Sequence, residues 1–274
     1  MRESTQAAER ASGSSFYNGM RILPRSQREA MFEIYAFCRA VDDIADDPGP
    51  RQGRLEALRK WRDDIQALYA GAPPPQLAGL ARAVRGFDLH REDFLAVIAG
   101  MEMDVLADIR APDRATLDLY CDRVACAVGR LSVRIFGMEQ KAGLALAHHL
   151  GRALQLTNIL RDLDEDAALG RLYLPREGLL LAGITSDDPV KVAADRALPK
   201  VCAGIVTRAR THFEKADEVM ARNSRRVVRA PRIMGKYYHA ILELLVARGF
   251  AAPREPVRIG KLSKLAIVLR YAFI

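Results

Sequence analysis

Three aspartates interrupt a stretch of sequence, FCRAVDDIAD, that otherwise has the apolar spacing of a buried helix face: Asp42, Asp43 and Asp46. A second acidic stretch, LQLTNILRDLDED, places Asp162 and Asp166 four residues apart, the spacing of Asp42 and Asp46. Residues four apart on a helix lie on one face, about a turn apart, so each pair of carboxylates can converge on a cation. Magnesium is the natural choice, because it takes oxygen ligands and is usually completed by phosphate groups.

Further polar residues accompany both aspartate pairs. Arg39 precedes the first pair, and Gln155, Asn158 and Arg161 precede the second. Gln155 and Asn158 extend the spacing of the second pair backwards, which predicts one continuous polar line on a helix. Such a line within an apolar helix face is costly unless something binds it. The pattern therefore favours a cation site over the alternative of acidic helix ends on a solvated surface.

Other residues that resemble functional sites carry weaker signals. Asp104 and Asp108, in GMEMDVLAD, repeat the four-residue spacing without a polar line, and we expect a structural or solvated pair. His148 and His149 are adjacent, so on a helix they point about 100° apart, and no HExxH motif accompanies them. We expect them to be core or surface residues rather than zinc ligands. No GxGxxG, P-loop or GxSxG motif occurs, which disfavours nucleotide-dependent and acyl-transfer chemistry.

The elements that must position these residues are helices. Apolar residues recur at three and four positions nearly everywhere, and alternating strand-like runs are absent, which predicts an all-α fold. A helix is expected from about Gln27 into the first aspartates, opened by a capping box of Ser26 and Glu29. The stretch GAPPPQ, residues 71–76, is expected to be an interhelical loop.

Composition limits the remaining classes. The 274 residues are half apolar, which predicts one large domain over 1–274 with a flexible N-terminal segment at 1–14. The sequence shows neither a run of 18 apolar residues nor a secretory signal, so we expect a cytoplasmic protein. The net charge of +8 suits phosphorylated small molecules or anionic lipid, and motifs for nucleic-acid binding are absent. The four cysteines, lacking CxxC spacing, are expected to be reduced.

Several separated stretches occur together: SFYNGMRILP, IYAFCRAVDDIAD, YCDRVACAVGRL and LQLTNILRDLDEDAALGRLYLP. Their order and spacing resemble the squalene and phytoene synthase family from roughly residue 15 to residue 250. The stretch GMEMDVLADIRAPDRATLDLYCDRVACAVGRLSVRIFGM is most similar to the bacterial members that serve hopanoid synthesis. That resemblance implies an all-α isoprenoid synthase fold that joins two farnesyl diphosphates into presqualene diphosphate and releases diphosphate.

The resemblance also implies roles for individual residues. Two helices would present the acidic motifs across a deep apolar cavity, where magnesium bridges to prenyl diphosphates. The implied metal ligands are Asp42, Asp43, Asp46, Asn158, Asp162 and Asp166. The implied catalytic residues are Asp42, Asp46, Asp162, Asp166 and Tyr120. The implied substrate-binding residues are Ser15, Phe16, Tyr35, Arg39, Gln155, Asn158, Arg161, Tyr173 and Tyr238.

Other functions remain open at the level of sequence. A phytoene synthase would perform the same first step on geranylgeranyl diphosphate, and a squalene synthase would go on to reduce the intermediate with NADPH. We expect no NADPH, because no dinucleotide fingerprint is present. A rival from another class is a helical adaptor whose acidic ends bind basic partners. Partners expected for the enzyme are farnesyl diphosphate and downstream isoprenoid enzymes.

The C-terminal segment PVRIGKLSKLAIVLRYAFI mixes cations with apolar residues. Such a composition is typical of a helix that lies in an anionic membrane interface. We therefore expect peripheral contact with the inner face of the plasma membrane. The alternative is a helix that packs on the body of the protein with its cations in solvent.

Overall fold

The computed structural model describes residues 20, 22–107, 109–260, 266–267 and 270. Over these residues the chain is helical, with one isolated β-bridge between Arg110 and Leu172, so the all-α prediction is confirmed. The longer helices are α3 (Arg25–Asp46), α4 (Arg51–Tyr69), α5 (Ala78–Phe87), α6 (Arg91–Ala107), α8 (Ala127–Phe136), α9 (Gln140–Arg161), α13 (Leu198–Ala221) and α14 (Arg225–Arg248). The shorter elements are η1 (Pro75–Leu77), α7 (Arg114–Cys121), the π-helical turn η2 (Asp122–Cys126), α10 (Leu163–Ala168), α11 (Arg176–Leu181) and α12 (Pro189–Ala193).

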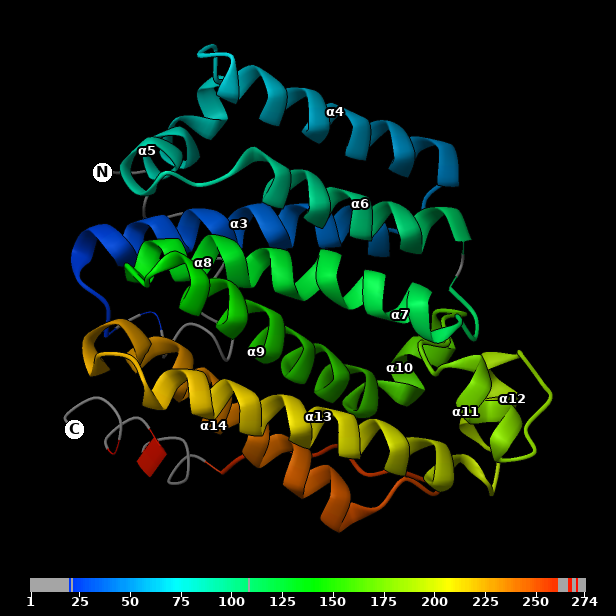
Figure 1. Ribbon diagram of the computed structural model, residues 1–274. Coiled ribbons are helices and arrows are strands. Elements are labelled where there is room, and N and C mark those ends of the chain that lie inside the picture. The colour runs from blue at the N-terminus through cyan, green and yellow to red at the C-terminus, as the bar shows by residue number, and fades with distance from the viewer. Residues whose placement is uncertain (1–19, 21, 108, 261–265, 268–269, 271–274) are drawn as a thin grey trace.

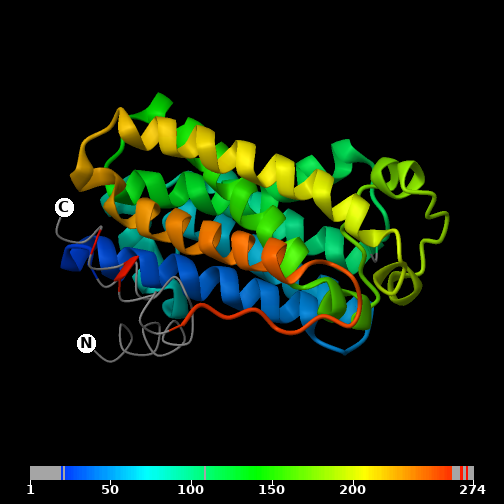
Figure 2. The same cartoon turned by 90° about the horizontal axis from the view of Figure 1, so that it is seen from below.

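The long helices form layers around two apolar clusters. Figure 1 shows α4, α5 and α6 on one side, α3 and α8 in the middle, and α9 and α13 on the other side. Figure 2, seen from below, shows α14 in front of α9, with α13 along one side of it and α3 along the other, and α14 contacts both α9 and α13. One cluster is built on α3 to α6 and α8, and the other on α7, α9, α13 and α14. Both clusters contribute walls to the cavity described below.

The helix of the first acidic motif begins slightly earlier than expected. α3 starts at Arg25, and Pro24 occupies the N-cap position, where no side chain caps the helix. The predicted capping box of Ser26 and Glu29 is therefore wrong. Arg25 donates from Nε to Glu29 Oε1 at 2.8 Å, so that carboxylate pairs along the helix instead of reaching back to the backbone. The helix does run into the aspartates, ending at Asp46.

The second acidic motif does not lie on one continuous helix, which corrects the sequence-based expectation. α9 ends at Arg161, Asp162 has φ −100° and ψ 17°, and α10 follows. The chain nevertheless stays wound, because the Asp162 N–H donates to the Asn158 carbonyl at 2.9 Å and the Asp166 N–H donates to the Asp162 carbonyl at 2.8 Å. The two aspartates therefore keep the one-turn spacing across the break.

A close approach joins α9 to η2. A Cβ placed on Gly151 would lie 2.9 Å from the backbone N and Cα of Cys126, so only glycine allows this contact without a shift. The π turn adds one residue per turn, and such turns are frequent at functional sites. Here it brings Val124 to the cavity wall.

Some expectations concern residues outside those described: the flexible segment at 1–14, Ser15 and Phe16, and most of the C-terminal membrane segment. The GAPPPQ stretch lies between α4 and α5, with η1 starting inside it. The four cysteines are free thiols, as expected. Among the described helices, none combines the length and apolar character needed to cross a membrane.

Candidate active site

A cavity of about 780 Å³ lies between the two acidic motifs. It brings together twelve of the residues singled out from the sequence. They are Tyr35, Arg39, Asp42, Asp46, Tyr120, Gln155, Asn158, Arg161, Asp162, Asp166, Tyr173 and Tyr238. The walls thus combine the end of α3, the end of α9, α10 and the aromatic residues between them.

Asp43 is the described site residue that the cavity lining does not include. Its side chain is 57% exposed and forms an ion pair with Arg39, with 2.8 Å between Asp43 Oδ1 and Arg39 Nη2. Asp42 and Asp43 are adjacent, so the helix directs them about 100° apart. Of these two residues, Asp42 lines the cavity and Asp43 does not.

The first motif is held by two arginines. Arg39 lies 3.3 Å from Asp42 through Nη1, and Arg171 donates from Nη1 to Asp46 Oδ1 at 2.6 Å. Burial, together with the charge of Asp46, raises the pKa of Asp42 to about 6. A group with a raised pKa is one whose negative charge lacks sufficient compensation. The first motif therefore has room for more positive charge than the chain supplies.

The negative charge of the second motif is compensated even less than that of the first. Arg161 forms two bonds to Asp162, from Nε and Nη2, each 2.7 Å long. Among the described residues Asp166 has no comparable bidentate partner, and burial together with the charge of Asp162 raises its pKa to about 8. Burial also raises the pKa of Tyr238, while a hydrogen bond with Arg161 opposes that rise. The carboxylate of Asp166 is thus poised to gain from a bound cation.

Asn158 tests whether these residues fit a magnesium ion. Its Nδ2 lies 3.5 Å from Gln155 Oε1, and its Oδ1 is buried without a hydrogen-bond partner among the described residues. A buried acceptor left unpaired is unfavourable, and oxygen is the ligand that magnesium prefers. Asn158 lies one turn before Asp162, and both line the cavity. The orphaned oxygen and the undercompensated carboxylates fit a magnesium site.

Asp104 is a site residue that the sequence reasoning missed. It is 5% exposed and lines the cavity, so it is not the solvated residue that one of the two expectations described, and Asp108 lies outside the described residues. Tyr173 donates its hydroxyl to Asp104 Oδ1 at 2.6 Å, and Tyr120 donates to Oδ2 at 3.1 Å. The two rings stack with centroids 4.9 Å apart. Burial raises the pKa of Asp104 to about 6, against the Tyr173 hydrogen bond.

A signal for Asp104 was present in the sequence. Val97 and Met101 precede it by seven and three residues, which is the spacing of one helix face. Both are buried and line the cavity. An acid on an otherwise apolar face requires partners, so this spacing identifies Asp104 more clearly than its distance from Asp108 does.

An apolar chamber of about 250 Å³ adjoins the acidic cavity. The two spaces share six lining residues, Tyr35, Cys38, Val124, Val128, Gln155 and Asn158. The far walls of the chamber come from α3, α8 and α9, with Ile34, Phe136 and Leu150 among them. Together the two spaces offer a polar end for an anion and an apolar end for a hydrocarbon chain.

This arrangement defines a class: an all-α isoprenoid synthase fold with acidic motifs at the mouth of an apolar chamber. Residues 9–263 match the squalene/phytoene synthase family model, and the chain belongs to this family. Its similarity to individual relatives extends over nearly the whole chain.

Two relatives named presqualene diphosphate synthase are similar over this length. The one from Rhodopseudomonas palustris is 69% identical over 264 residues, covering 96% of this chain and 95% of that protein. The one from Sinorhizobium fredii is 67% identical, covering 96% and 94%. A solved dehydrosqualene synthase structure superposes with a TM-score of 0.85, 98% coverage of this chain and 95% of that one. At 23% identity, that likeness concerns the fold.

Proposed function

We propose that the chain condenses two farnesyl diphosphates into presqualene diphosphate and releases one diphosphate. The observation that carries this proposal is the acidic cavity opening onto an apolar chamber through shared walls. The two relatives at 69% and 67% identity support the particular product, because both are named for this activity. Both acidic motifs resemble those of the squalene and phytoene synthase family, and this resemblance also supports prenyl diphosphates as the substrate class.

The polar end binds the diphosphates. Arg39 and Arg161 line the cavity, and each is engaged by an aspartate of its own motif. With these aspartates engaged by a cation, both guanidinium groups would be free to donate to diphosphate oxygens, which their planar fork of N–H groups suits well. Magnesium, held by Asp42, Asp46, Asn158, Asp162 and Asp166, would supply charge neutralisation for the leaving diphosphate.

The apolar end governs the carbon chemistry. When the carbon–oxygen bond of the first farnesyl diphosphate breaks, its allylic carbon bonds to C2 of the second chain. Loss of a proton from that same carbon lets it bond to C3 and closes the cyclopropane. The released diphosphate accepts the proton, so atoms and charges balance. Apolar walls exclude water from the carbocation, and aromatic faces such as that of Tyr35 stabilise it.

Asp104 positions the aromatic wall. Because both tyrosine hydroxyls donate to this carboxylate, Tyr120 and Tyr173 are held in one stacked orientation at the cavity surface. Both tyrosines line the cavity, so a carbocation there would meet rings and hydroxyls that do not reorient. A fixed dipole or ring stabilises developing charge better than one that must reorient.

The test is an incubation of the purified chain with farnesyl diphosphate and magnesium, without NADPH. We expect accumulation of presqualene diphosphate, detected by mass analysis as its dephosphorylated alcohol, and no squalene. Parallel incubations use geranylgeranyl diphosphate, and farnesyl diphosphate with NADPH. Preference for the twenty-carbon substrate would indicate a phytoene synthase, and squalene formed with NADPH would indicate a reductive enzyme.

Peripheral membrane contact belongs to the same proposal. The sequence from residue 257 to 274 interleaves Arg258, Lys261, Lys264 and Arg270 with apolar residues. Farnesyl chains and a thirty-carbon product partition into lipid, so docking at the inner membrane face would ease their exchange and the transfer to downstream isoprenoid enzymes. The full chain should sediment with anionic liposomes, less so at high salt. Equal binding by a chain that ends at Pro256 would contradict this role.

A further inference from the structure

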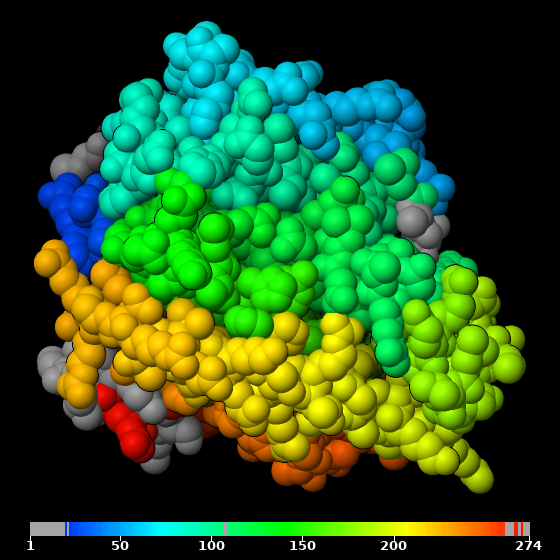
Figure 3. Space-filling view, in the orientation of Figure 1, coloured from blue at the N-terminus to red at the C-terminus, as the bar shows by residue number. Residues whose placement is uncertain are grey.

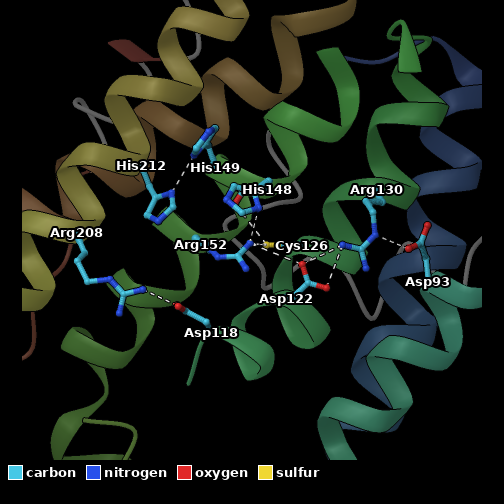
Figure 4. A network of polar contacts seen from close by, with 10 residues as sticks. All are labelled: Asp93, Asp118, Asp122, Cys126, Arg130, His148, His149, Arg152, Arg208 and His212. Atoms are coloured by element: carbon cyan, nitrogen blue, oxygen red, sulfur yellow. Dashed lines mark hydrogen bonds and ion pairs between the residues drawn. The ribbon is translucent and has the colours of Figure 1, made fainter. Parts of the chain in front are cut away.

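Three histidines from two helices gather in a cluster that the proposed reaction does not use. His148 and His149 lie on α9 and His212 lies on α13, and one potential ligand atom from each lies within 4.8 Å of the others. Figure 4 shows the three rings together, with His149 Nδ1 3.0 Å from His212 Nδ1. The rings of the two neighbouring histidines meet edge to face, with centroids 4.7 Å apart.

The two helices hold this cluster in place. α9 and α13 lie side by side in Figures 1 and 2 and share an extensive apolar contact. Buried residues on both sides of the cluster, Leu146, Leu150 and Ala209 among them, fix the distance between the helix axes. Figure 3 shows the yellow segment that contains α13 against the green segment that contains α9 on one face of the molecule. His148 is exposed and His149 and His212 are half-buried, so the cluster is open to solvent on one side.

The chemical state of the rings suits a metal ion. Burial, together with the neighbouring His149, lowers the pKa of His212 to about 4. Burial also lowers the pKa values of His148 and His149, with a nearby cation or imidazole adding to the effect. Neutral imidazoles keep a lone pair on one ring nitrogen, and the neutral form is the one that ligates metals.

Arg152 is the residue that competes for this cluster. Its Nη1 lies 2.8 Å from His148 Nδ1, 3.1 Å from Cys126 Sγ and 3.7 Å from Asp122 Oδ1. Asp122 also accepts from Arg130, as Figure 4 shows. Because the Asp122 carboxylate is within reach of Arg152, the guanidinium can move away from His148 and still have a charged partner. Asp122 also reduces the repulsion that this guanidinium exerts on a second cation.

We propose that His148, His149 and His212 form a site for a borderline divalent transition metal, with Zn²⁺ as the expected occupant, that joins α9 to α13. Zinc binds imidazole nitrogen at about 2.0–2.1 Å with tetrahedral geometry, which places ligating nitrogens roughly 3.3 Å apart. The 3.0 Å between His149 and His212 is close to that separation. The exposed side leaves a fourth position for water or another ligand.

This site differs in chemistry from the acidic cavity. Three imidazoles select zinc and its neighbours in the first transition row, whereas carboxylate and amide oxygens suit magnesium. The sequence alone could not reveal it, since His212 is 63 residues from His149 and no motif spacing links them. His148 and His149 point about 100° apart on α9. They form a set of three possible metal ligands only because His212 of α13 lies against them.

The test is calorimetric titration of the full chain with ZnCl₂ at neutral pH, in excess magnesium to occupy the carboxylates. We expect one equivalent bound, with affinity reduced at least about tenfold in His149→Ala and in His212→Ala. His90→Ala, which removes an exposed histidine elsewhere, is the matched control and should bind as the unaltered chain does. Zinc at a hundredfold its dissociation constant should raise the melting temperature by about 5 °C.

Three results would overturn the proposal: no saturable binding by the unaltered chain, undiminished binding by His212→Ala, or a thiolate charge-transfer band with Co²⁺. The last would place the ion on Cys126, which lies beside Arg152. If His212→Ala does not fold, as judged by circular dichroism in EDTA, His212→Gln replaces it. If His149 and His212 are only a structural hydrogen-bonded pair, the unaltered chain will show no saturable zinc binding.

Discussion

Arg171 connects the two acidic motifs. Its side chain donates from Nη1 to Asp46 Oδ1 at 2.6 Å and from Nη2 to the Ala45 carbonyl at 3.0 Å. Its backbone N–H donates to the Asp166 carbonyl at 2.8 Å. One residue therefore fixes the end of α3 relative to α10, and with it the separation of the two aspartate pairs across the cavity.

Replacing Arg171 should reduce catalysis because it frees Asp46 from this position. We expect Arg171→Gln to lower kcat/KM by about tenfold to a hundredfold, the range for residues that orient metal ligands. Arg171→Lys should recover only part of the loss, since an ammonium lacks the planar fork that serves Asp46 and Ala45 together. Steady-state kinetics with farnesyl diphosphate measure both.

Arg110→Gln is the matched control for that experiment. Arg110 is exposed and donates from Nε to the Gly170 carbonyl at 3.1 Å, so it contacts the same loop without lining the cavity. Its loss should leave kcat/KM within about twofold. Equal effects of the two substitutions would mean that the loop, and not the contact with Asp46, determines the rate.

The four aspartates of the two acidic motifs that line the cavity should each be essential. Asp42→Ala, Asp46→Ala, Asp162→Ala and Asp166→Ala are each expected to lower the rate at least about a hundredfold while the fold stays intact, because each removes a magnesium ligand. Asp43→Ala should have a smaller effect than Asp42→Ala, since the Asp43 side chain points away from the cavity lining. Near-normal turnover in any two of the four would refute the two-motif model.

Asp104 should act through the tyrosines that it binds. We expect Asp104→Asn to lower kcat by about tenfold or more, because an amide offers one acceptor oxygen where two hydroxyls donate. Tyr173→Phe combined with Asp104→Asn should lose less than the sum of the single effects, since both break the same contact. Full additivity in this double-mutant cycle would show that the carboxylate acts independently of Tyr173.

Asp93→Asn controls for the loss of a buried charge on the same helix. Asp93 is 6% exposed and accepts from Arg130 Nε at 2.5 Å, away from the cavity lining. Removing it leaves Arg130 undercompensated and should lower the melting temperature with little change in kcat. A fall in kcat as large as that of Asp104→Asn would attribute both effects to the stability of α6.

The sequence predicted the features that depend on local spacing. The apolar stripe of α3 has Ile34, Phe37 and Val41 on one buried face, and this periodicity led correctly to a helix ending at the aspartates. Asp162 and Asp166 likewise lie one turn apart in the structure, as their four-residue spacing predicted, although the helix breaks at Asp162. The break was not predictable, because no proline or glycine marks it.

What the sequence could not give were contacts between distant segments. Arg171 meets Asp46 across 125 residues, and Tyr173 meets Asp104 across 69. Asp46 and Tyr173 were singled out in the sequence, but no spacing in the sequence links Asp46 to Arg171 or Tyr173 to Asp104. The family resemblance supplied Tyr173 as a site residue but not the carboxylate that orients it.

The raised pKa of Asp166 predicts how stability depends on pH in the metal-free chain. Burial and the charge of Asp162 raise this pKa from its ordinary 3.8 to about 8. The folded chain therefore binds this proton more tightly than the unfolded chain does. Between about pH 4 and about pH 8 the unfolded state holds fewer protons than the folded state, so the free energy of unfolding falls as the pH rises.

Asp166→Asn should abolish this part of the slope, because the amide has no charge to bury. In EDTA near pH 8 we expect its melting temperature to exceed that of the unaltered chain by about 4 °C or more, and near pH 4 the two should converge. Asp63→Asn, at an exposed position on α4, controls for net charge and should change neither value appreciably. Magnesium should stabilise the unaltered chain near pH 8 more than the variant, since it compensates the charge that the variant lacks. A melting temperature of Asp166→Asn that is lower at both pH values would show that the carboxylate serves the fold rather than cation binding.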